Sequence, residues 1–448
     1  MRPKPTSRRT GAARAALAVC VGLAASACGS SMPSIGNLFN EKEEVLAGKR
    51  VAALQAETGG AETTASIAAK EPVTLPAPAT NASWSQPGGV ASNAPGHLSV
   101  SGGGGPSWRS DAGAGSSKSG RLTAVPIVAD GKVFTLDTEG SVSAFSANGG
   151  ARLWRMSLRP EKEKARSGFG GGLAYDAGRL FVATGYGTIY GLDPSSGKTV
   201  WTKAIGVPVR NSPTAAQGKV FIVNVESQLY ALNAADGSEA WIARGLPELA
   251  SMLSNVSPAV SGNLVIAPYS SGEISAYDIN TGEPVWTDSI SRSSAAGTAY
   301  AAIGEPARPV VDGPAVYAVS RAGRLIATSK TDGERLWQRD ISGAQTPWVA
   351  GDTLFVVDVN GKLMALSRKD GKTKWMTELP GAKNWSGPVL ASGKLWLASD
   401  KGLLVGVDAV TGAVAQKTDI GSPVFISPVA ANGRIYVLSD KANLIALN

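Results

Sequence analysis

The sequence predicts an all-β fold, an eight-bladed β-propeller whose last blade is closed by an N-terminal strand around Trp108. An eleven-residue phrase occurs eight times at intervals of 38 to 51 residues, and short apolar runs separated by glycine turns precede each copy. A repeat of about 40 residues made of short antiparallel strands is typical of propeller blades. A further observation predicts the closure: the last copy of the phrase stops short, and a stretch resembling its missing strand lies upstream of the first copy.

The phrase has a small residue at its first place, glycine at its seventh and tryptophan at its eleventh, as in residues 231–241. The first place is held by Ala144, Gly191, Ala231, Ala276, Ala327, Ala365, Gly406 and Ala446. The glycines are Gly150, Gly197, Gly237, Gly282, Gly333, Gly371 and Gly412. The tryptophans are Trp154, Trp201, Trp241, Trp286, Trp337 and Trp375, and the seventh copy has Gln416 at this place.

Physical chemistry suggests a reason for each fixed place. Glycine suits a tight turn with positive φ. A tryptophan at the start of the outermost strand can cover the seam to the next blade and bury a large apolar area there. The small first residue is expected to let the next blade approach.

The first complete blade can be followed strand by strand. Residues 126–136 predict a strand, a glycine turn and a second strand, residues 140–145 a third, and residues 152–158 a fourth. Later copies open with proline, which is tolerated at the start of a strand. These prolines are Pro213, Pro258, Pro309, Pro347, Pro388 and Pro428.

The closure prediction rests on the eighth copy, which ends at residues 446–448 and lacks a tryptophan strand. Residues 106–111 resemble that strand, and Trp108 precedes Trp154 by one repeat length. An open ring would leave two unpaired strand edges. We therefore expect residues 106–448 to form the propeller, with the Trp108 strand completing the eighth blade.

The N-terminal 105 residues predict an export signal and a tether. Residues 1–14 are basic, residues 15–25 are apolar, and small residues precede Cys28. This pattern is typical of an exported lipoprotein, with a signal peptide over residues 1–27 and lipidation at Cys28. The alternative is ordinary cleavage after Ala27. Residues 28–105 are rich in Ala, Ser, Thr, Pro and Gly, which predicts a flexible or extended tether.

Charge and composition exclude several classes of function. Five of the 43 basic residues lie in residues 1–27, which leaves 38 basic against 35 acidic residues in the remainder. Such a balance predicts no nucleic-acid partner. The two cysteines, Cys20 and Cys28, both precede the predicted propeller, and His97 is the one histidine. The propeller therefore offers no Ser-His-Asp or Cys-His arrangement and no His/Cys metal cluster, and we expect neither catalytic residues nor a cofactor. His97 is expected to be a packing or surface residue.

Long connections between blades are the expected functional elements. They cover residues 155–171, 242–257 and 287–308. The middle one carries Leu249, Met252 and Leu253, which either fold back on the blade or bind a partner. Residues 168–172 are rich in glycine but open no helix, so they are a weak match to a dinucleotide-binding motif.

The phrase Ala-x-Asp-x-x-x-Gly-x-x-x-Trp resembles the tryptophan-docking repeat of pyrroloquinoline-quinone dehydrogenases. Those proteins are eight-bladed propellers, and many carry an adjacent cysteine pair and a calcium site. The cysteine pair is absent from this chain.

The whole architecture of signal, tether and propeller more closely resembles the BamB family of outer-membrane β-barrel assembly (BAM) lipoproteins. Residues 84–89, 96–98 and 121–126 resemble the alphaproteobacterial form. The resemblance implies a non-enzymatic scaffold, lipid-anchored at the periplasmic face of the outer membrane. It would dock onto the periplasmic (POTRA) domains of BamA and onto other BAM subunits, and would aid folding and insertion of outer-membrane proteins, with unfolded ones as further partners. The residues that the resemblance assigns to partner binding are Leu249, Met252, Leu253 and Glu305. The alternative is a periplasmic quinoprotein-like dehydrogenase or ligand sensor.

Overall fold

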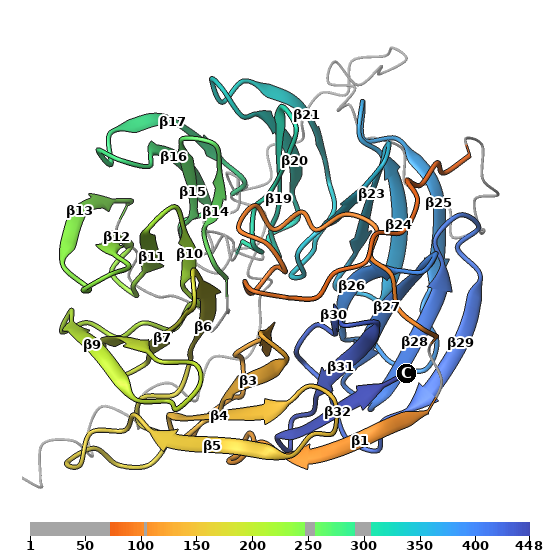
Figure 1. The fold of residues 1–448 in the computed structure, drawn as a ribbon. Coiled ribbons are helices and arrows are strands. Elements are labelled where there is room, and N and C mark those ends of the chain that lie inside the picture. The colour runs from red at the N-terminus through yellow and green to blue at the C-terminus, as the bar shows by residue number, and fades with distance from the viewer. Residues whose placement is uncertain (1–71, 103–104, 247–255, 292–305) are drawn as a thin grey trace, which may run out of the picture. The chain divides into compact units, whose positions relative to one another are not determined.

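The computed structural model describes residues 72–102, 105–246, 256–291 and 306–448. The strands in these ranges form eight antiparallel sheets of four strands each, which are arranged as the blades of a propeller (Figure 1). This confirms the predicted all-β, eight-bladed fold. No helix in the described ranges has the length and apolar character needed to cross a bilayer.

Seven blades are continuous in sequence, and each runs from its innermost to its outermost strand. Blades one and two contain β2 (Ile127–Ala129), β3 (Lys132–Leu136), β4 (Ser141–Ser146), β5 (Arg152–Ser157), β6 (Gly171–Asp176), β7 (Arg179–Thr184), β8 (Thr188–Leu192) and β9 (Thr199–Ala204). Blades three and four contain β10 (Thr214–Ala216), β11 (Lys219–Val223), β12 (Gln228–Asn233), β13 (Glu239–Arg244), β14 (Ala259–Ser261), β15 (Leu264–Pro268), β16 (Glu273–Asp278) and β17 (Pro284–Ser289). Blades five and six contain β18 (Val310–Asp312), β19 (Ala315–Val319), β20 (Leu325–Ser329), β21 (Arg335–Arg339), β22 (Trp348–Ala350), β23 (Thr353–Val357), β24 (Lys362–Ser367) and β25 (Thr373–Glu378). Blade seven contains β26 (Trp385–Ala391), β27 (Lys394–Ser399), β28 (Leu403–Asp408) and β29 (Val414–Asp419).

The eighth blade joins the two ends of the array. It contains β30 (Val429–Ala431), β31 (Arg434–Leu438) and β32 (Asn443–Leu447), and its outermost strand is β1 (Pro106–Asp111). Trp108 pairs with Ala446 in the register that Trp154 and Ala144 adopt in blade one. The predicted closure by the Trp108 strand is therefore confirmed.

The small first residue of the phrase lies opposite the tryptophan of its own blade. Ala231 pairs with Trp241, and Gly191 pairs with Trp201. A Cβ atom added to Gly191 would collide with the Trp201 indole. The expected reason for the small residue, approach of the next blade, was therefore wrong: the residue makes room for the indole across its own sheet.

Each tryptophan lies at the seam to the following blade. Its Nε1–H donates to the carbonyl at the fourth place of the next phrase, over 2.7 to 3.3 Å. Its ring lies against the glycine at the seventh place of that phrase, where an added Cβ would be less than 3.0 Å from a ring atom. The donors are Trp108, Trp154, Trp201, Trp241, Trp286, Trp337 and Trp375. All seven glycines have φ between 69° and 76°, so both the turn and the seam require glycine.

The core lies in the inner strands of the blades. In blade one, β3 and β4 are buried over most of their length, whereas β5 is largely exposed. Apolar side chains from adjacent sheets interdigitate at the seams, as in other packed sheets. The outermost strand of blade one therefore meets solvent over much of its length, and the inner strands supply the core.

The segment of residues 72–102, here called the strap, differs from the expected tether. Val73, Trp84, Leu98 and Val100 are buried in the propeller core. The strap lies inside the ring, as the orange ribbon in Figure 1. The prediction of a tether up to residue 105 was based on composition, but the strap is held by backbone hydrogen bonds, which composition does not report. Residues 28–71 lie outside the described part of the chain.

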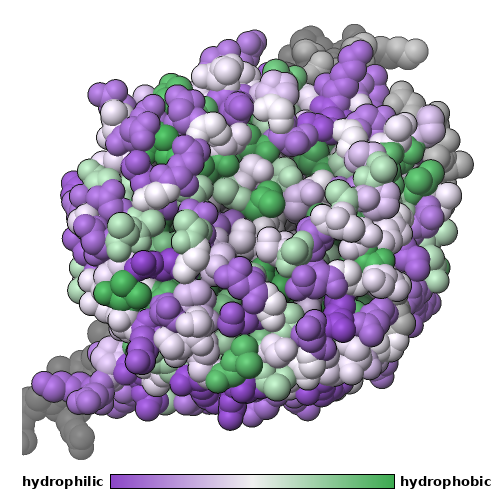
Figure 2. Space-filling view, in the orientation of Figure 1, coloured by the Kyte–Doolittle hydropathy of each residue, from purple (hydrophilic) through white to green (hydrophobic). Residues whose placement is uncertain are grey.

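From residue 81 to residue 101 the strap makes one full circuit of the ring. Its hydrogen bonds reach the inner edge of every blade in the order eight, one, two, three, four, five, six, seven and eight again. The blade residues bonded in turn are Ala430, Val128, Tyr175, Ala215, Val260, Val311, Trp348, Leu390 and Gly433. The strap therefore satisfies inner strand edges that would otherwise carry unpaired backbone groups. On the face seen in Figure 2, hydrophilic residues cover most of the rim.

Candidate functional site

The connections between blades all start where an outermost strand ends and finish where the next innermost strand begins. They therefore gather at the end of the ring where the innermost strands start, here called the connection face. The three long connections span from β5 to β6, from β13 to β14 and from β17 to β18. Among the described residues of its connecting segments, two large apolar side chains are exposed, Leu246 with 61% of its surface and Phe425 with 44%.

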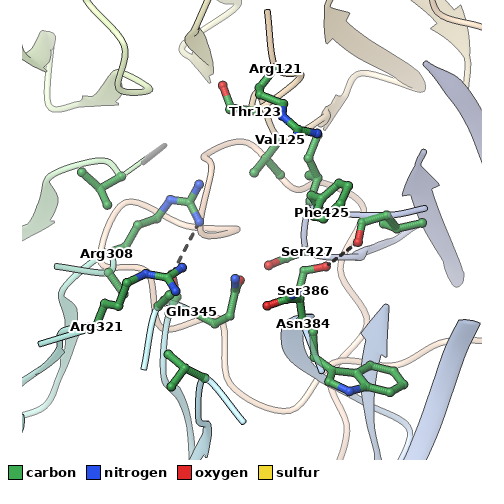
Figure 3. Close-up of a pocket in the computed structure, with 18 of the residues that line it drawn as sticks. Arg121, Thr123, Val125, Arg308, Arg321, Gln345, Asn384, Ser386, Phe425 and Ser427 are labelled. Atoms are coloured by element: carbon green, nitrogen blue, oxygen red, sulfur yellow. Dashed lines mark hydrogen bonds between the residues drawn. The ribbon is translucent and has the colours of Figure 1, made fainter. Parts of the chain in front are cut away.

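A cavity of about 390 Å³ opens at the centre of the connection face (Figure 3). Its walls come from the segments that lead into the innermost strands of several blades. In Figure 3, Arg308, Arg321 and Gln345 lie on one wall, and Asn384, Ser386 and Ser427 lie on the facing wall. The volume is in the range of small-ligand sites.

The strap and the cavity lie at different levels along the ring axis. In blade one the cavity is lined by Val125, whereas the strap bonds to Val128, further along the same segment. The same order holds for Val256 before Val260 in blade four and for Arg308 before Val311 in blade five. The cavity therefore opens on the connection face, and the strap crosses the channel beyond it.

Four bases and two acids line the cavity. The bases are Arg121, Arg308, Arg321 and Lys383, and the acids are Asp358 and Asp440. Arg308 is 8% exposed, and burial lowers the pKa of its guanidinium to about 10. It still carries its charge at neutral pH, but that charge has lost much of its hydration. The described lining of the cavity is thus polar, with more basic than acidic side chains.

The two acids of the cavity are used in local structure. An Asp358 carboxylate oxygen accepts hydrogen bonds from the backbone N–H groups of Asn360 and Lys362 at 2.8 Å each. Asp440 lies 3.9 Å from the Arg121 guanidinium. Among the described residues no group of three or more His, Cys, Asp and Glu side chains is placed to hold a metal ion. Calcium prefers several oxygen ligands, and the described residues that line the cavity offer no such cluster, so they do not fit the calcium site of a quinone enzyme.

His97, the one histidine, has a structural position in the strap. It is buried, its Nδ1 lies 2.7 Å from the carbonyl oxygen of Pro76, and its Nε2 accepts the N–H of Gly393 at 2.8 Å. With Nε2 as the acceptor of this bond, Nδ1 is the ring atom placed to donate to Pro76. His97 thereby fastens two parts of the strap to blade seven.

The glycine-rich stretch is also structural. Residues 168–172 lead into β6, and side chains in place of Gly168, Gly171 and Gly172 would collide with blade atoms. An added Cβ at Gly168 would meet the Tyr186 ring, and one at Gly172 would meet the Ser212 hydroxyl. Close packing of blade two explains these glycines without a nucleotide.

The residues predicted to bind a partner, Leu249, Met252, Leu253 and Glu305, lie outside the described residues, as does Cys28. The described chain on either side of them ends at the connection face, and Leu246 and Val256 are the described residues of the middle connection that flank Leu249, Met252 and Leu253. The central cavity had not been predicted. Its residues come from short segments of several blades that lie far apart in the sequence, and no local motif marks them.

Curated proteins that are similar to this chain include outer membrane protein assembly factors. It is 26% identical to outer membrane protein assembly factor BamB of Moranella endobia over 227 residues, covering 48% of this chain and 57% of that protein. It is 26% identical to BamB of Yersinia pestis over 213 residues, covering 47% of this chain and 54% of that protein. An uncharacterized protein of Rickettsia conorii is 27% identical over 225 residues, which cover 49% of this chain and 54% of that protein. The matches thus span about half the length of these curated relatives.

Two solved structures share the fold. BamB from Moraxella catarrhalis has a TM-score of 0.64 at 17% identity and covers 75% of this chain and 99% of that one. Quinohemoprotein alcohol dehydrogenase from Comamonas testosteroni has a TM-score of 0.66 at 13% identity, and the match covers 82% of this chain and 80% of that one. At these identities the likeness concerns the fold alone, and enzymes and assembly factors share it.

The family assignment rests on a family model that matches most of the chain. The family model described as outer membrane protein assembly factor BamB matches residues 47–166, 138–377 and 378–448. These ranges include the strap, all eight blades and the closing strand. The chain therefore belongs to the BamB family of outer membrane protein assembly factors.

Proposed function

We propose that this protein is a non-enzymatic scaffold of the outer-membrane protein assembly machinery. The observation that carries the proposal is the family match across the strap and all eight blades, since relatives in that family are named as assembly factors. In this role the propeller docks onto the periplasmic POTRA domains of BamA. It thereby helps keep the other subunits of the complex and unfolded outer-membrane proteins close to BamA.

The connection face is the docking surface in this proposal. Two of its three long connections carry the residues Leu249, Met252, Leu253 and Glu305. Leu246, at the described edge of the middle connection, is largely exposed, and its backbone N–H is held by the Glu273 carboxylate at 2.9 Å. An apolar residue presented on a rigid scaffold is the kind of anchor that dominates protein interfaces.

Anchoring follows from the N-terminal sequence. Acylation of Cys28 would hold the chain at the periplasmic face of the outer membrane, and residues 29–71 would connect the anchor to the strap. Mass spectrometry of the mature protein tests this step, since the proposal requires acyl chains on Cys28 and their loss in Cys28→Ser. An unmodified mature N-terminus would count against it.

Affinity capture from cells tests the docking role. The tagged full-length protein should recover a BamA-like partner, and a variant with Leu249, Met252 and Leu253 all changed to Glu should recover much less. Val200→Glu is the matched control, because Val200 is 53% exposed on the outermost strand of blade two. Failure to recover such a partner, together with a normal outer-membrane protein profile in a deletion strain, would contradict the proposal.

The quinoprotein-like enzyme or sensor is the weaker candidate. The chain has the same fold as a quinohemoprotein dehydrogenase. However, Asp358 of the central cavity accepts hydrogen bonds within a turn, and Asp440 pairs with Arg121. Reconstitution with the quinone and calcium should leave the absorbance spectrum of the protein unchanged. A new quinone band with dye-linked alcohol oxidation would reverse the ranking.

A further inference from the structure

Seven seams of the propeller share one device, here called the tryptophan lock: an indole bonds to the next blade and packs on the glycine of its turn. The seam from blade seven to blade eight is built differently. Gln416 takes the place of the tryptophan, and its side-chain oxygen accepts a hydrogen bond from Lys394 of the same blade at 3.2 Å. The outermost strand of blade eight is β1, so the described residues of that blade offer no glycine turn to receive an indole.

The other side of blade eight is fastened well to blade one. The Trp108 Nε1–H donates to the Ala147 carbonyl oxygen of blade one at 3.3 Å, and the Arg434 guanidinium donates to the same oxygen at 2.7 Å. Toward blade seven, the exposed Arg109 of β1 donates to the Ile420 carbonyl oxygen over 3.3 Å. By these contacts, the rim of blade eight is tied more closely to blade one than to blade seven.

The two ends of the strap overlap at the seam that lacks the tryptophan lock. The Ala79 N–H donates to the carbonyl oxygen of His97, and the Ala79 carbonyl oxygen accepts the N–H of Ser99, at 2.8 Å each. Two residues further on, the Asn81 amide donates to the Ala430 carbonyl oxygen of blade eight at 2.7 Å. Residues 79–81 therefore lie beside residues 97–101, and the strap is doubled here.

The doubled part of the strap is bonded to both sides of this seam. On blade seven, the Ser392 hydroxyl accepts the Val100 N–H at 2.9 Å and donates to the Val100 carbonyl oxygen at 2.8 Å. On blade eight, the Gly433 carbonyl oxygen accepts the N–H of Ser101 at 2.8 Å. Val100 is also buried in the apolar core. Two adjacent residues of the strap thus join blades seven and eight at their inner edges.

We propose that this overlap of the strap is a latch that takes the role of the missing tryptophan lock, and that the ring opens between blades seven and eight when the latch is released. Apolar packing between inner strands keeps the ring closed at rest. Local opening starts where few interactions resist it, and the rim of this seam has no tryptophan lock. Blade eight then stays with blade one, to which Trp108 and Arg434 hold it. The inference concerns the motion of the ring and is independent of docking through the connection face.

Distances between pairs of spin labels in the full mature chain, measured by double electron–electron resonance, test the proposal. Cys28→Ser leaves residues 28–448 without a cysteine, so labels attach where cysteines are introduced. Each label replaces the exposed residue just before the eleventh place of the phrase or its equivalent in β1. The pair across blades seven and eight is Ala415→Cys with Ser107→Cys, and the pair across blades two and three is Val200→Cys with Ala240→Cys. With the latch intact, each pair should give one narrow distance distribution.

Ser392→Ala together with Asn81→Ala releases the latch. The pair across blades seven and eight should then show a second population, longer by about 3 Å or more, because an opened seam admits at least one layer of water. The pair across blades two and three should not change. Gln86→Ala is the matched control, because the Gln86 amide bonds to blades two and three at 2.9 Å each, across a seam that Trp201 locks. It should leave both distances unchanged.

A second measurement decides if the double variant fails to fold. In the chain with an unmodified strap, at urea concentrations below the unfolding transition, the pair across blades seven and eight should lengthen before the pair across blades two and three. A pair across blades seven and eight that keeps one distance after release of the latch would overturn the proposal, as would a pair across blades two and three that opens as readily. In each of those cases capture of a BamA-like partner could still succeed, so the two proposals fail separately.

Discussion

Trp84 of the strap stacks on Trp348 of blade six, with 6.1 Å between ring centroids and 23° between ring planes. The backbone of Trp84 exchanges two hydrogen bonds with Val128 of blade one, at 2.7 and 2.9 Å. One residue of the strap thus links blades one and six across the inside of the ring. The strap therefore stabilises the propeller as a whole.

Replacing Trp84 by Ala should lower the free energy of unfolding by about 3–5 kcal/mol, because the change empties a buried aromatic site. Urea denaturation followed by far-ultraviolet circular dichroism measures the loss. Val90→Ala is the control, since Val90 lies in the same strap with 39% of its surface exposed, and it should cost less than about 1 kcal/mol. Equal effects of the two variants would show that the strap adds little to stability.

The seam glycines allow a matched comparison. Gly237 and Gly218 both have φ of 74°, but an added Cβ meets the Trp201 ring at Gly237 and open space at Gly218. Gly218→Ala should cost about 1–2 kcal/mol from the backbone conformation alone. Gly237→Ala should cost a further 1–3 kcal/mol or so, because it also separates two blades. Urea denaturation of both variants measures the difference, and equal losses would contradict the seam contact.

The start of the strap is held to blade six by a pH-sensitive ion pair. Lys374, which is buried, lies 2.8 Å from the Asp352 carboxylate and 3.2 Å from the Pro72 carbonyl oxygen. Burial alone would raise the pKa of Asp352, but hydrogen bonds from Lys374 and Thr353 lower it below its ordinary value. A lowered carboxyl pKa contributes stability that is present at neutral pH and is lost as pH falls through the folded-state pKa.

Asp352→Asn should therefore cost about 2 kcal/mol at pH 7, since it leaves the buried ammonium without its anionic partner. The cost should shrink as pH falls below about 4, the ordinary pKa of an aspartate in the unfolded chain, and it is lost once pH has passed below the lowered pKa of folded Asp352. Urea denaturation of both proteins between pH 7 and pH 3 measures it. A stability difference that is constant over this range would show that the pair contributes no pH dependence.

Deletion of residues 106–111 should open the ring. Without β1, the outer edge of β32 is unpaired and the Trp108 indole no longer covers the seam at Ala147. Thermal unfolding should broaden, and its midpoint should fall by about 10 °C or more. Deletion of six exposed residues, 159–164, from the connection after β5 is the matched control. A midpoint unchanged by the first deletion would contradict closure by β1.

The periodic part of the structure could be predicted from the sequence. The phrase fixes where each blade turns and where its tryptophan lies, and the 46-residue step from Trp108 to Trp154 located the closing strand. These features depend on side chains that recur at the same place in every blade. One physical reason was nevertheless wrong, because Ala231 accommodates Trp241 of its own blade and not the next blade.

The strap and the cavity could not be predicted, for two different reasons. The strap binds mainly through its backbone, as in the contact from the Ala91 carbonyl oxygen to Val260 N–H at 2.7 Å. Such contacts leave no periodic pattern, although Trp84 and Leu98 in an otherwise small and polar stretch were an available signal. The cavity brings Arg308 and Lys383 together only once the ring has closed.

The docking proposal is tested most directly by the affinity of the purified mature chain for the purified periplasmic region of its BamA partner. Biolayer interferometry should show saturable binding with one chain per partner. The triple change of Leu249, Met252 and Leu253 to Glu should weaken that binding at least tenfold, and Val200→Glu should leave it unchanged. Absence of saturable binding, or equal affinity of the triple variant and the unmodified chain, would contradict docking through the connection face.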